Sequence, residues 1–347
     1  MSKNNRLSYI DIARAFAMIF IVLGHTLVHS EHCHLIFKFL YSFHVVLFFI
    51  LSGYTFKTNS SYLSFVKNKF IRIMIPYFVW AVLFLIPYMM FGGSVGSSIG
   101  TTSSFDLKTQ LFNILYGNGN NAALKQNSSL WFLPALFTME MLYYFIVNLS
   151  QKSRKYHLPI LISMISISYI TNIFFPIVLP WGINTVLEVG VFFYIGYLLK
   201  YYNFFERNSA FCNLNYIIPI FIIGLLACFL NDSIVSCIDY KYGYFTLALI
   251  SGFCLSIVII YIAFIINKNK VLEYIGKNTM GILIFHKLII LIFQTKLGVI
   301  SRLLNNSNVL IELTLSLIVT ILSIIFSLIG TKIVRKVCPI LIGENSR

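Results

Sequence analysis

The sequence predicts an all-α integral membrane protein, a bundle of about ten transmembrane helices with both the N- and the C-terminus in the cytoplasm. Composition is the first observation: 58% of the 347 residues are hydrophobic and 11% are charged, whereas a soluble domain carries about 25% charged residues. A chain this apolar cannot enclose its hydrophobic side chains in a water-facing globule. The second observation is that long apolar runs alternate with short basic segments. Together they exclude a soluble enzyme, a secreted disulfide module and a disordered chain.

Apolar runs long enough to cross a bilayer recur along the chain. A hydrocarbon core about 30 Å thick requires roughly 20 apolar residues in a helix. The runs cover residues 10–29, 36–56, 72–91, 129–149, 159–179, 183–201, 214–231, 242–266, 280–298 and 310–333. We therefore expect ten membrane-spanning helices in this order.

The basic residues predict the orientation of these helices. Of the 26 Lys and Arg, nineteen fall on the set of connections that includes both termini, six fall on the opposite set, and Lys287 lies within a span. Cytoplasmic loops of membrane proteins carry an excess of Lys and Arg. The alternation therefore predicts that both termini are cytoplasmic. The same clustering explains the net charge of +15 without a nucleic-acid partner.

The longest connection, residues 92–128, falls on the outer side in this topology. It is rich in Gly, Ser and Asn, as in Gly92-Gly93-Ser94, and this composition is typical of a flexible loop. We expect residues 1–347 to form a single membrane domain with no additional soluble domain.

Cysteine and histidine spacing indicates neither a disulfide framework nor a metal site. The six cysteines include no Cys-x-x-Cys pair, and most lie in apolar runs, where a free thiol packs as a small hydrophobic group. A polar cluster occupies the first outer turn, at His29, Glu31, His32, Cys33 and His34. Its spacing matches no standard metal site, so we expect the protein to use no metal.

Three ionisable residues of the first helix are candidates for catalysis, because charged groups within a bilayer are costly and usually functional. Asp11, Arg14 and His25 share one helix face, since eleven residues bring His25 within about 20° of three whole turns from Arg14. His25 then lies about 16 Å beyond Arg14 along the helix. Each residue has a structural alternative. Asp11 caps the helix, Arg14 anchors the topology at the surface, or His25 is a packed core histidine.

Other ionisable residues also fall within predicted spans. Glu140 lies in the middle of the fourth helix, and Glu188 lies about five residues from the outer end of the sixth. His44 opens the second helix at a similar outer depth, whereas His286 and Lys287 lie in the ninth helix, nearer the cytoplasm. A structural hydrogen bond to a neighbouring helix is the alternative for both carboxylates, and structural roles are equally open for the two histidines.

Five motifs, in order along the chain, resemble the membrane acyltransferase-3 family, the multi-pass O-acyltransferases that modify bacterial surface polysaccharides. The first motif is Asp11 and Arg14 followed, after ten residues, by His25. The other four are Phe48-Phe49-Ile50-Leu51-Ser52-Gly53-Tyr54, Lys69-Phe70-Ile71-Arg72 with Pro76-Tyr77, Ser129-Leu130-Trp131-Phe132-Leu133-Pro134, and Gly276-Lys277-Asn278-Thr279-Met280-Gly281 through His286. The resemblance covers the chain from end to end and includes the ten-helix count.

The resemblance implies transfer of an acyl group, usually acetyl, from cytoplasmic acetyl-CoA to a sugar hydroxyl. In that family the Arg and His of the first helix, here Arg14 and His25, are tied to activity. Arg14, with Arg72 as a helper, suits the binding of anionic phosphates near the inner surface. His25 suits a general base that accepts the proton of the sugar hydroxyl, or a nucleophile that carries the acyl group itself.

A carboxylate from Asp11, Glu140 or Glu188 then orients or charge-stabilises this histidine, and the sequence leaves the choice among the three open. The implied location is the bacterial cytoplasmic membrane. The expected partners are the lipid bilayer, a surface or lipid-linked glycan acceptor and other polysaccharide assembly proteins. Two alternatives remain: a proton-coupled transporter or flippase of a small polar or glycan substrate, since intramembrane Arg, His and Glu also suit transport, and a non-catalytic partner that presents a glycan.

Overall fold

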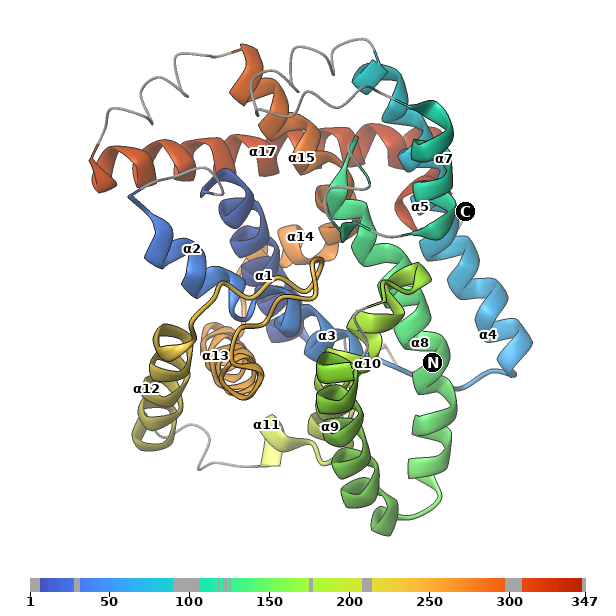
Figure 1. Cartoon of the computed structure of the whole chain (residues 1–347), viewed down its shortest axis with the longest axis vertical. Coiled ribbons are helices and arrows are strands. Elements are labelled where there is room, and N and C mark those ends of the chain that lie inside the picture. Colours follow the sequence, from blue (N-terminus) through green and yellow to red (C-terminus); the bar gives the residue numbers. More distant parts are fainter. Residues whose placement is uncertain are drawn as a thin grey trace.

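The structure is a computed structural model, and it describes residues 7–27, 32–89, 106–117, 119–120, 124, 126–174, 177–207, 214–296 and 308–344. Apart from one isolated β-bridge between Ser236 and Lys241, the regular structure of these residues is helical. The predicted all-α class is confirmed. Figure 1 shows α1 running through the middle of the bundle and α17 lying across one side of it.

The helices differ widely in length. The α-helices are α1 (Ser8–Leu27), α2 (His34–Tyr41), α3 (His44–Tyr54), α4 (Tyr62–Lys69), α5 (Ile75–Leu83), α7 (Leu107–Tyr116), α8 (Phe132–Gln151), α9 (His157–Phe174), α10 (Ile183–Tyr201), α11 (Phe204–Arg207), α12 (Leu214–Leu230), α13 (Phe245–Ile266), α14 (Lys270–Lys277), α15 (Thr279–Lys296) and α17 (Val309–Val337). Between them lie a π-helical turn at Phe70–Met74 and 3₁₀ turns at Ser128–Trp131, Arg154–Tyr156, Pro180–Gly182 and Pro339–Ile342.

The described residues contain eight helical segments long and apolar enough to cross a membrane, or nine when one bent pair counts as a single span. The protein is therefore a multi-pass membrane protein. The count is below the ten that we predicted. The seventh predicted run forms α12, whose 17 residues extend only about 26 Å. The ninth run forms α15, which meets α14 at an 82° bend and qualifies as a span only together with it.

The start of the third predicted span also differs from the structure. The third span begins at Tyr62 rather than at residue 72, because α4 and the π-helical turn precede α5 in the same segment.

The predicted flexible loop 92–128 contains the helix α7. Its first turn is capped by the Asp106 side chain, which accepts from two backbone N–H groups, and it ends at Gly117 in a left-handed conformation with φ of 67°. Residues 92–105 lie outside the described part of the chain.

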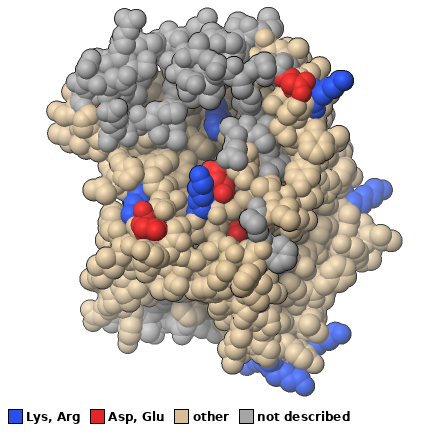
Figure 2. Space-filling model, in the orientation of Figure 1, with Lys and Arg blue, Asp and Glu red and all other residues tan. Residues whose placement is uncertain are grey.

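Burial separates central helices from peripheral ones. In the most apolar 18-residue stretch of the spans of α1 and α10, 72% of the residues are buried. The corresponding share is 22% for the span of α9 and 33% for that of α17. The outer faces of the peripheral helices expose large apolar side chains such as Ile162, Ile173, Ile321 and Ile333. Figure 2 shows few acidic or basic residues among the described residues on the face in view. Exposed apolar surface of this kind suits contact with lipid.

Glycines of the central helices pack directly against the backbone of neighbouring helices. A Cβ on Gly53 of α3 would lie 1.9 Å from the carbonyl oxygen of Phe193, and one on Gly196 of α10 would lie 1.9 Å from that of Ile50. A Cβ on Gly276 of α14 would lie 1.8 Å from the carbonyl oxygen of Asp11, so this contact is equally close. The last contact fixes the α14–α15 pair against the start of α1.

Candidate functional site

Helix α1 is continuous from Ser8 to Leu27, so Asp11, Arg14 and His25 lie on one helix face as their spacing predicted. The two ends of this face have different surroundings. Asp11 and Arg14 lie at the end that packs against α14. His25 lies three turns away, and it lines a cavity.

At the Arg14 end the polar groups pair with one another. Arg14 donates from Nη2 to Oγ1 of Thr55 over 2.8 Å, and its Nη1 lies 3.7 Å from Oδ1 of Asp11. Asp11 is 1% exposed, whereas the Arg14 side chain is 25% exposed. Arg72 belongs to the π-helical turn, where its backbone carbonyl lies next to Gly343. The structure therefore keeps Arg14 accessible beside a buried carboxylate.

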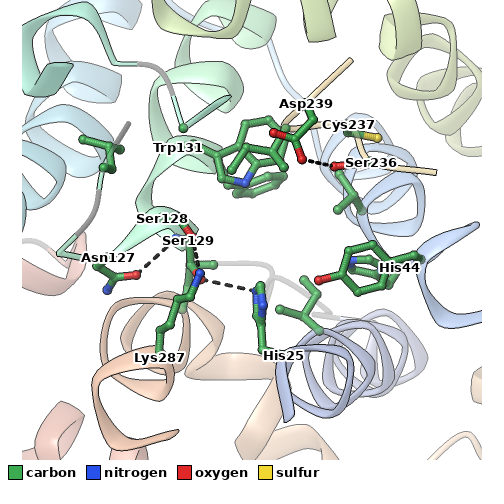
Figure 3. Close-up of a pocket in the computed structure, with 18 of the residues that line it drawn as sticks. His25, His44, Asn127, Ser128, Ser129, Trp131, Ser236, Cys237, Asp239 and Lys287 are labelled. Carbon is green, nitrogen blue, oxygen red and sulfur yellow. Dashed lines mark hydrogen bonds between the residues drawn. The ribbon is translucent and has the colours of Figure 1, made fainter. Parts of the chain in front are cut away.

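At the His25 end a cavity of about 620 Å³ opens between α1, α3, α15, the Ser128–Trp131 turn and the loop that follows α12. Ligand pockets usually have volumes of roughly 300–1,000 Å³. Figure 3 shows His25, Ser129 and Lys287 on one side of the cavity, with Ser236 and Asp239 across from them. His25 is thus placed beside a space that is large enough for reactants.

Three side chains from three elements meet beside the cavity, and two of them, His25 and Ser129, line it. Nε2 of His25 lies 3.4 Å from Oγ of Ser129, and Nε2 of His286 lies 3.3 Å from the same hydroxyl oxygen. The two imidazole rings stack, with centroids 5.3 Å apart and planes inclined by 30°. His286 is fully buried. We expected His286 to lie nearer the cytoplasm than His25, but the stacking places the two rings at the same level of the bundle.

The neighbouring residues of this pair form a second contact. Lys287 donates from Nζ to Oγ of Ser128, and both residues line the cavity. Asn127 fixes the turn in place, since it accepts from the backbone N–H of Ser129 over 3.2 Å and donates to the carbonyl of Ile284 over 2.8 Å. The cavity therefore holds a cation beside two hydroxyl groups and an imidazole.

The opposite wall comes from the loop between α12 and α13. Ser236 donates from Oγ to Oδ2 of Asp239 over 2.8 Å, and the Ser236–Lys241 bridge closes the loop. Thr185 of α10 donates to the carbonyl of Cys237 over 3.0 Å. Burial raises the pKa of the Cys237 thiol to about 12, so this cavity-lining cysteine is neutral and is not a thiolate nucleophile.

Glu188 helps to hold that loop, because it accepts from the Tyr242 hydroxyl over 2.9 Å. Glu140 pairs with Lys69, whose Nζ lies 2.6 Å from its Oε1. Neither glutamate lines the cavity, and neither does Asp11. Within the described residues, the hydrogen bond of His25 is the one to Ser129. The structure therefore does not bring the carboxylate that we expected to His25.

Sequence reasoning missed Ser128 and Asp239, noted Ser129 only as the first residue of the fourth motif, and treated Lys287 only as an unusual charge within a span. A serine and a loop aspartate outside these motifs carry no anomaly that a linear pattern detects. Lys287 did carry a detectable anomaly, since a lysine within an apolar run is costly. The sequence did not show its partner, Ser128, which lies 159 residues away in the chain.

Metal-ligand geometry is absent from the described residues: no group of three or more His, Cys, Asp or Glu could hold an ion there. His32, from the polar outer turn, instead lies 2.9 Å from the buried carboxylate of Glu312. His29 and Glu31 of the same turn lie outside the described residues.

Comparison with known proteins adds the family. A family model described as an acyltransferase domain matches residues 7–331, a range that includes all five motifs noted in the sequence and both ends of the Arg14–His25 face. No curated protein and no solved structure matches the chain. Because the family model covers most of the chain, the protein belongs to the acyltransferase 3 family and is a multi-pass membrane acyltransferase.

Proposed function

We propose that this protein transfers an acetyl group from cytoplasmic acetyl-CoA to a hydroxyl of a cell-surface or lipid-linked polysaccharide in the bacterial cytoplasmic membrane. The observation that carries the proposal is the cavity around His25, where an imidazole, a hydroxyl pair and a lysine cation surround about 620 Å³ within a chain of this family. Family membership also favours this function over the transporter and the glycan-presenting partner.

His25 acts as the general base in this proposal. It accepts the proton of the acceptor hydroxyl while the hydroxyl oxygen bonds to the thioester carbon. Lys287, held by Ser128, supplies positive charge to the carbonyl oxygen as negative charge develops there. Acylation of His25 itself remains the covalent alternative. Acetyl detected on His25, in protein held with acetyl-CoA and no acceptor, favours that route.

Arg14 binds the anionic part of the donor, with help from Arg72, near the cytoplasmic end of α1. Support comes from the partial exposure of the Arg14 side chain and from its position about 16 Å from His25 on the same face. Ile21 lies one turn before His25 and also lines the cavity, so the cavity extends from His25 toward Arg14. An extended thioester arm laid along this face reaches from the phosphates to the base.

The proposal includes a topology in which both termini are cytoplasmic and the 92–128 segment is external. A reporter fused after Arg347 is expected to be active only in the cytoplasm, and one inserted at residues 92–128 only outside. Finding both reporters on one side of the membrane contradicts this topology.

The decisive experiment is mass spectrometry of surface glycans from cells with and without the protein. We expect an added acetyl group on a repeating unit that depends on the protein and is lost in the His25→Gln variant at equal protein level. Unchanged glycan masses, together with uptake of a labelled sugar into sealed vesicles, would favour the transporter instead.

A further inference from the structure

We infer that Ser129 and His286 are positioning residues that fix the tautomer of His25, placing the proton on Nε2 and leaving Nδ1 as the basic nitrogen. The inference rests on the proposed role of His25 as the base. It assigns to that role two residues that contact His25 or its partner directly and come from the Ser128–Trp131 turn and α15.

The proton positions follow from the carbonyl at one end of the chain of hydrogen bonds. Nδ1 of His286 lies 2.7 Å from the carbonyl oxygen of Ile282, which can only accept, so Nδ1 carries the proton. In a neutral imidazole the other nitrogen is then an acceptor. A charged His286 would place a second cation beside Lys287 in a fully buried position, which is costly. Nε2 of His286 therefore accepts.

Ser129 has a single hydroxyl hydrogen to share between two imidazoles. Because Nε2 of His286 accepts, the hydroxyl donates to it over 3.3 Å. The oxygen of Ser129 then has only lone pairs to offer to His25, so the 3.4 Å contact requires that Nε2 of His25 donates. These hydrogen bonds therefore place the proton of neutral His25 on Nε2 without the help of a carboxylate.

The opposite arrangement leaves a buried acceptor without a donor. If Ser129 donated to His25, Nε2 of His286 would lose its hydrogen bond, since Ser129 is its partner in the described part of the structure. A buried polar atom without a partner costs free energy comparable to a lost hydrogen bond. The direction from His25 through Ser129 to His286 is therefore favoured.

The serine is held in this position from two sides. Asn127 accepts from its backbone N–H and donates to the carbonyl of Ile284, two residues before His286. Ser128 accepts from Lys287, one residue after His286. These contacts tie the turn to the same stretch of α15 that carries the second imidazole.

The consequence for catalysis is that Nδ1 of His25 is available for proton transfer. Among the described residues it has no hydrogen-bond partner, and His25 lines the cavity. In the transfer it takes the hydroxyl proton as the oxygen–carbon bond forms, and it returns that proton to the departing thiolate sulfur as the carbon–sulfur bond breaks. While His25 is charged, its Nε2–H remains bonded to Ser129, whose dipole stabilises the imidazolium.

The direct test is NMR of purified protein with ¹⁵N-labelled histidine, with the His25 signals identified by their loss in His25→Gln. We expect a protonated Nε2 and an unprotonated Nδ1 for His25 at a pH where it is neutral. Ser129→Ala and His286→Leu should give a mixture of tautomers. Ser129→Thr and His286→Gln retain a hydroxyl and an acceptor, so both should keep the single tautomer.

Kinetics provide the second readout. Loss of a tautomer-fixing carboxylate in a Ser-His-Asp triad costs about 10⁴ in turnover, and a neutral hydroxyl should contribute less. We expect Ser129→Ala to lower kcat by about 10–100-fold with the KM for acetyl-CoA unchanged. Ser251→Ala is the matched control, because Ser251 is also buried and, among the described residues, its hydroxyl donates to the carbonyl of Ala248 in its own helix.

Two results would overturn the inference: a proton on Nδ1 of His25 in the wild type, or an unchanged single tautomer in both Ser129→Ala and His286→Leu. A correct tautomer in a protein that transfers no acetyl group would support the inference about the hydrogen bonds and contradict the proposed function. The inference about the His25 tautomer and the proposed acetyl transfer can therefore be contradicted independently of each other.

Discussion

The two ends of helix α1 show how one helix can carry two different kinds of polar group. At the Arg14 end the charges neutralise each other locally: Asp11 is buried and pairs with Arg14 one turn away, and Gly276 packs directly against the backbone. At the His25 end no carboxylate contacts the imidazole within the described residues, and the cavity brings groups from distant segments to it instead.

The difference teaches that depth in the membrane and alignment on a helix do not assign a role. Asp11 is buried and His25 is partly buried on one face of α1, yet of the two it is His25 that lines the cavity of about 620 Å³. A group that takes part in chemistry needs space for a reactant, whereas a group that stabilises a helix contact needs a partner. Four changes test this distinction between the two ends.

The largest expected effect is at the cavity end. His25→Gln retains hydrogen bonding but cannot take up a proton near neutral pH. We expect turnover to fall by about 10²–10⁴-fold while acetyl-CoA binding and protein level stay near normal. The measurement is acetyl transfer per mole of folded, purified protein. Full specific activity in this variant ends the assignment of His25 as the base.

The next effect concerns donor binding at the other end. Arg14→Ala removes a charge-assisted contact that we expect to persist through the reaction, so the KM for acetyl-CoA should rise about 10–100-fold with little change in kcat. Steady-state kinetics in detergent or liposomes measure both constants. Arg14→Lys keeps the charge but loses the planar fork, and wild-type kinetics in that variant would argue against a bidentate contact.

A structural change at the same end should affect folding rather than chemistry. Gly276→Ala places a methyl group against the carbonyl of Asp11, at 1.8 Å before any shift, and should lower stability by about 1–3 kcal/mol. Thermal unfolding of purified protein measures this loss. Gly330→Ala is the control, since its nearest contact is the Phe285 ring at 3.3 Å and alanine favours a helix. Equal stability of the two variants would refute the close crossing.

The smallest effect is expected at Glu188, which supports the cavity wall without lining it. Its amide variant, Glu188→Gln, still offers an oxygen to the Tyr242 hydroxyl, so activity should stay within about threefold of wild type. Glu188→Leu removes the acceptor and should disturb the loop more strongly. A loss near 100-fold in Glu188→Gln would mean that a carboxylate does act on His25, contrary to the contrast between the two ends.

Much of the fold was predictable because its causes are local in sequence. Apolar runs gave the helical class, and helix periodicity gave the shared face of Arg14 and His25. The span count was less predictable. The 82° bend beside Asn278 lies next to the close contact of Gly276 with the backbone of α1, and no hydropathy pattern contains a contact between segments more than 250 residues apart.

The sequence by itself determined that this chain spans a membrane, and it placed Arg14 and His25 about three turns apart on one helix, because both properties depend on residue type and helical repeat. Only the tertiary structure decided what surrounds His25. Ser129 and His286 are 157 residues apart, and they meet because Asn127 ties a short turn to the carbonyl of Ile284. Such a contact depends on how packed helices place two backbones, and the residue types involved give no sign of it in the linear chain.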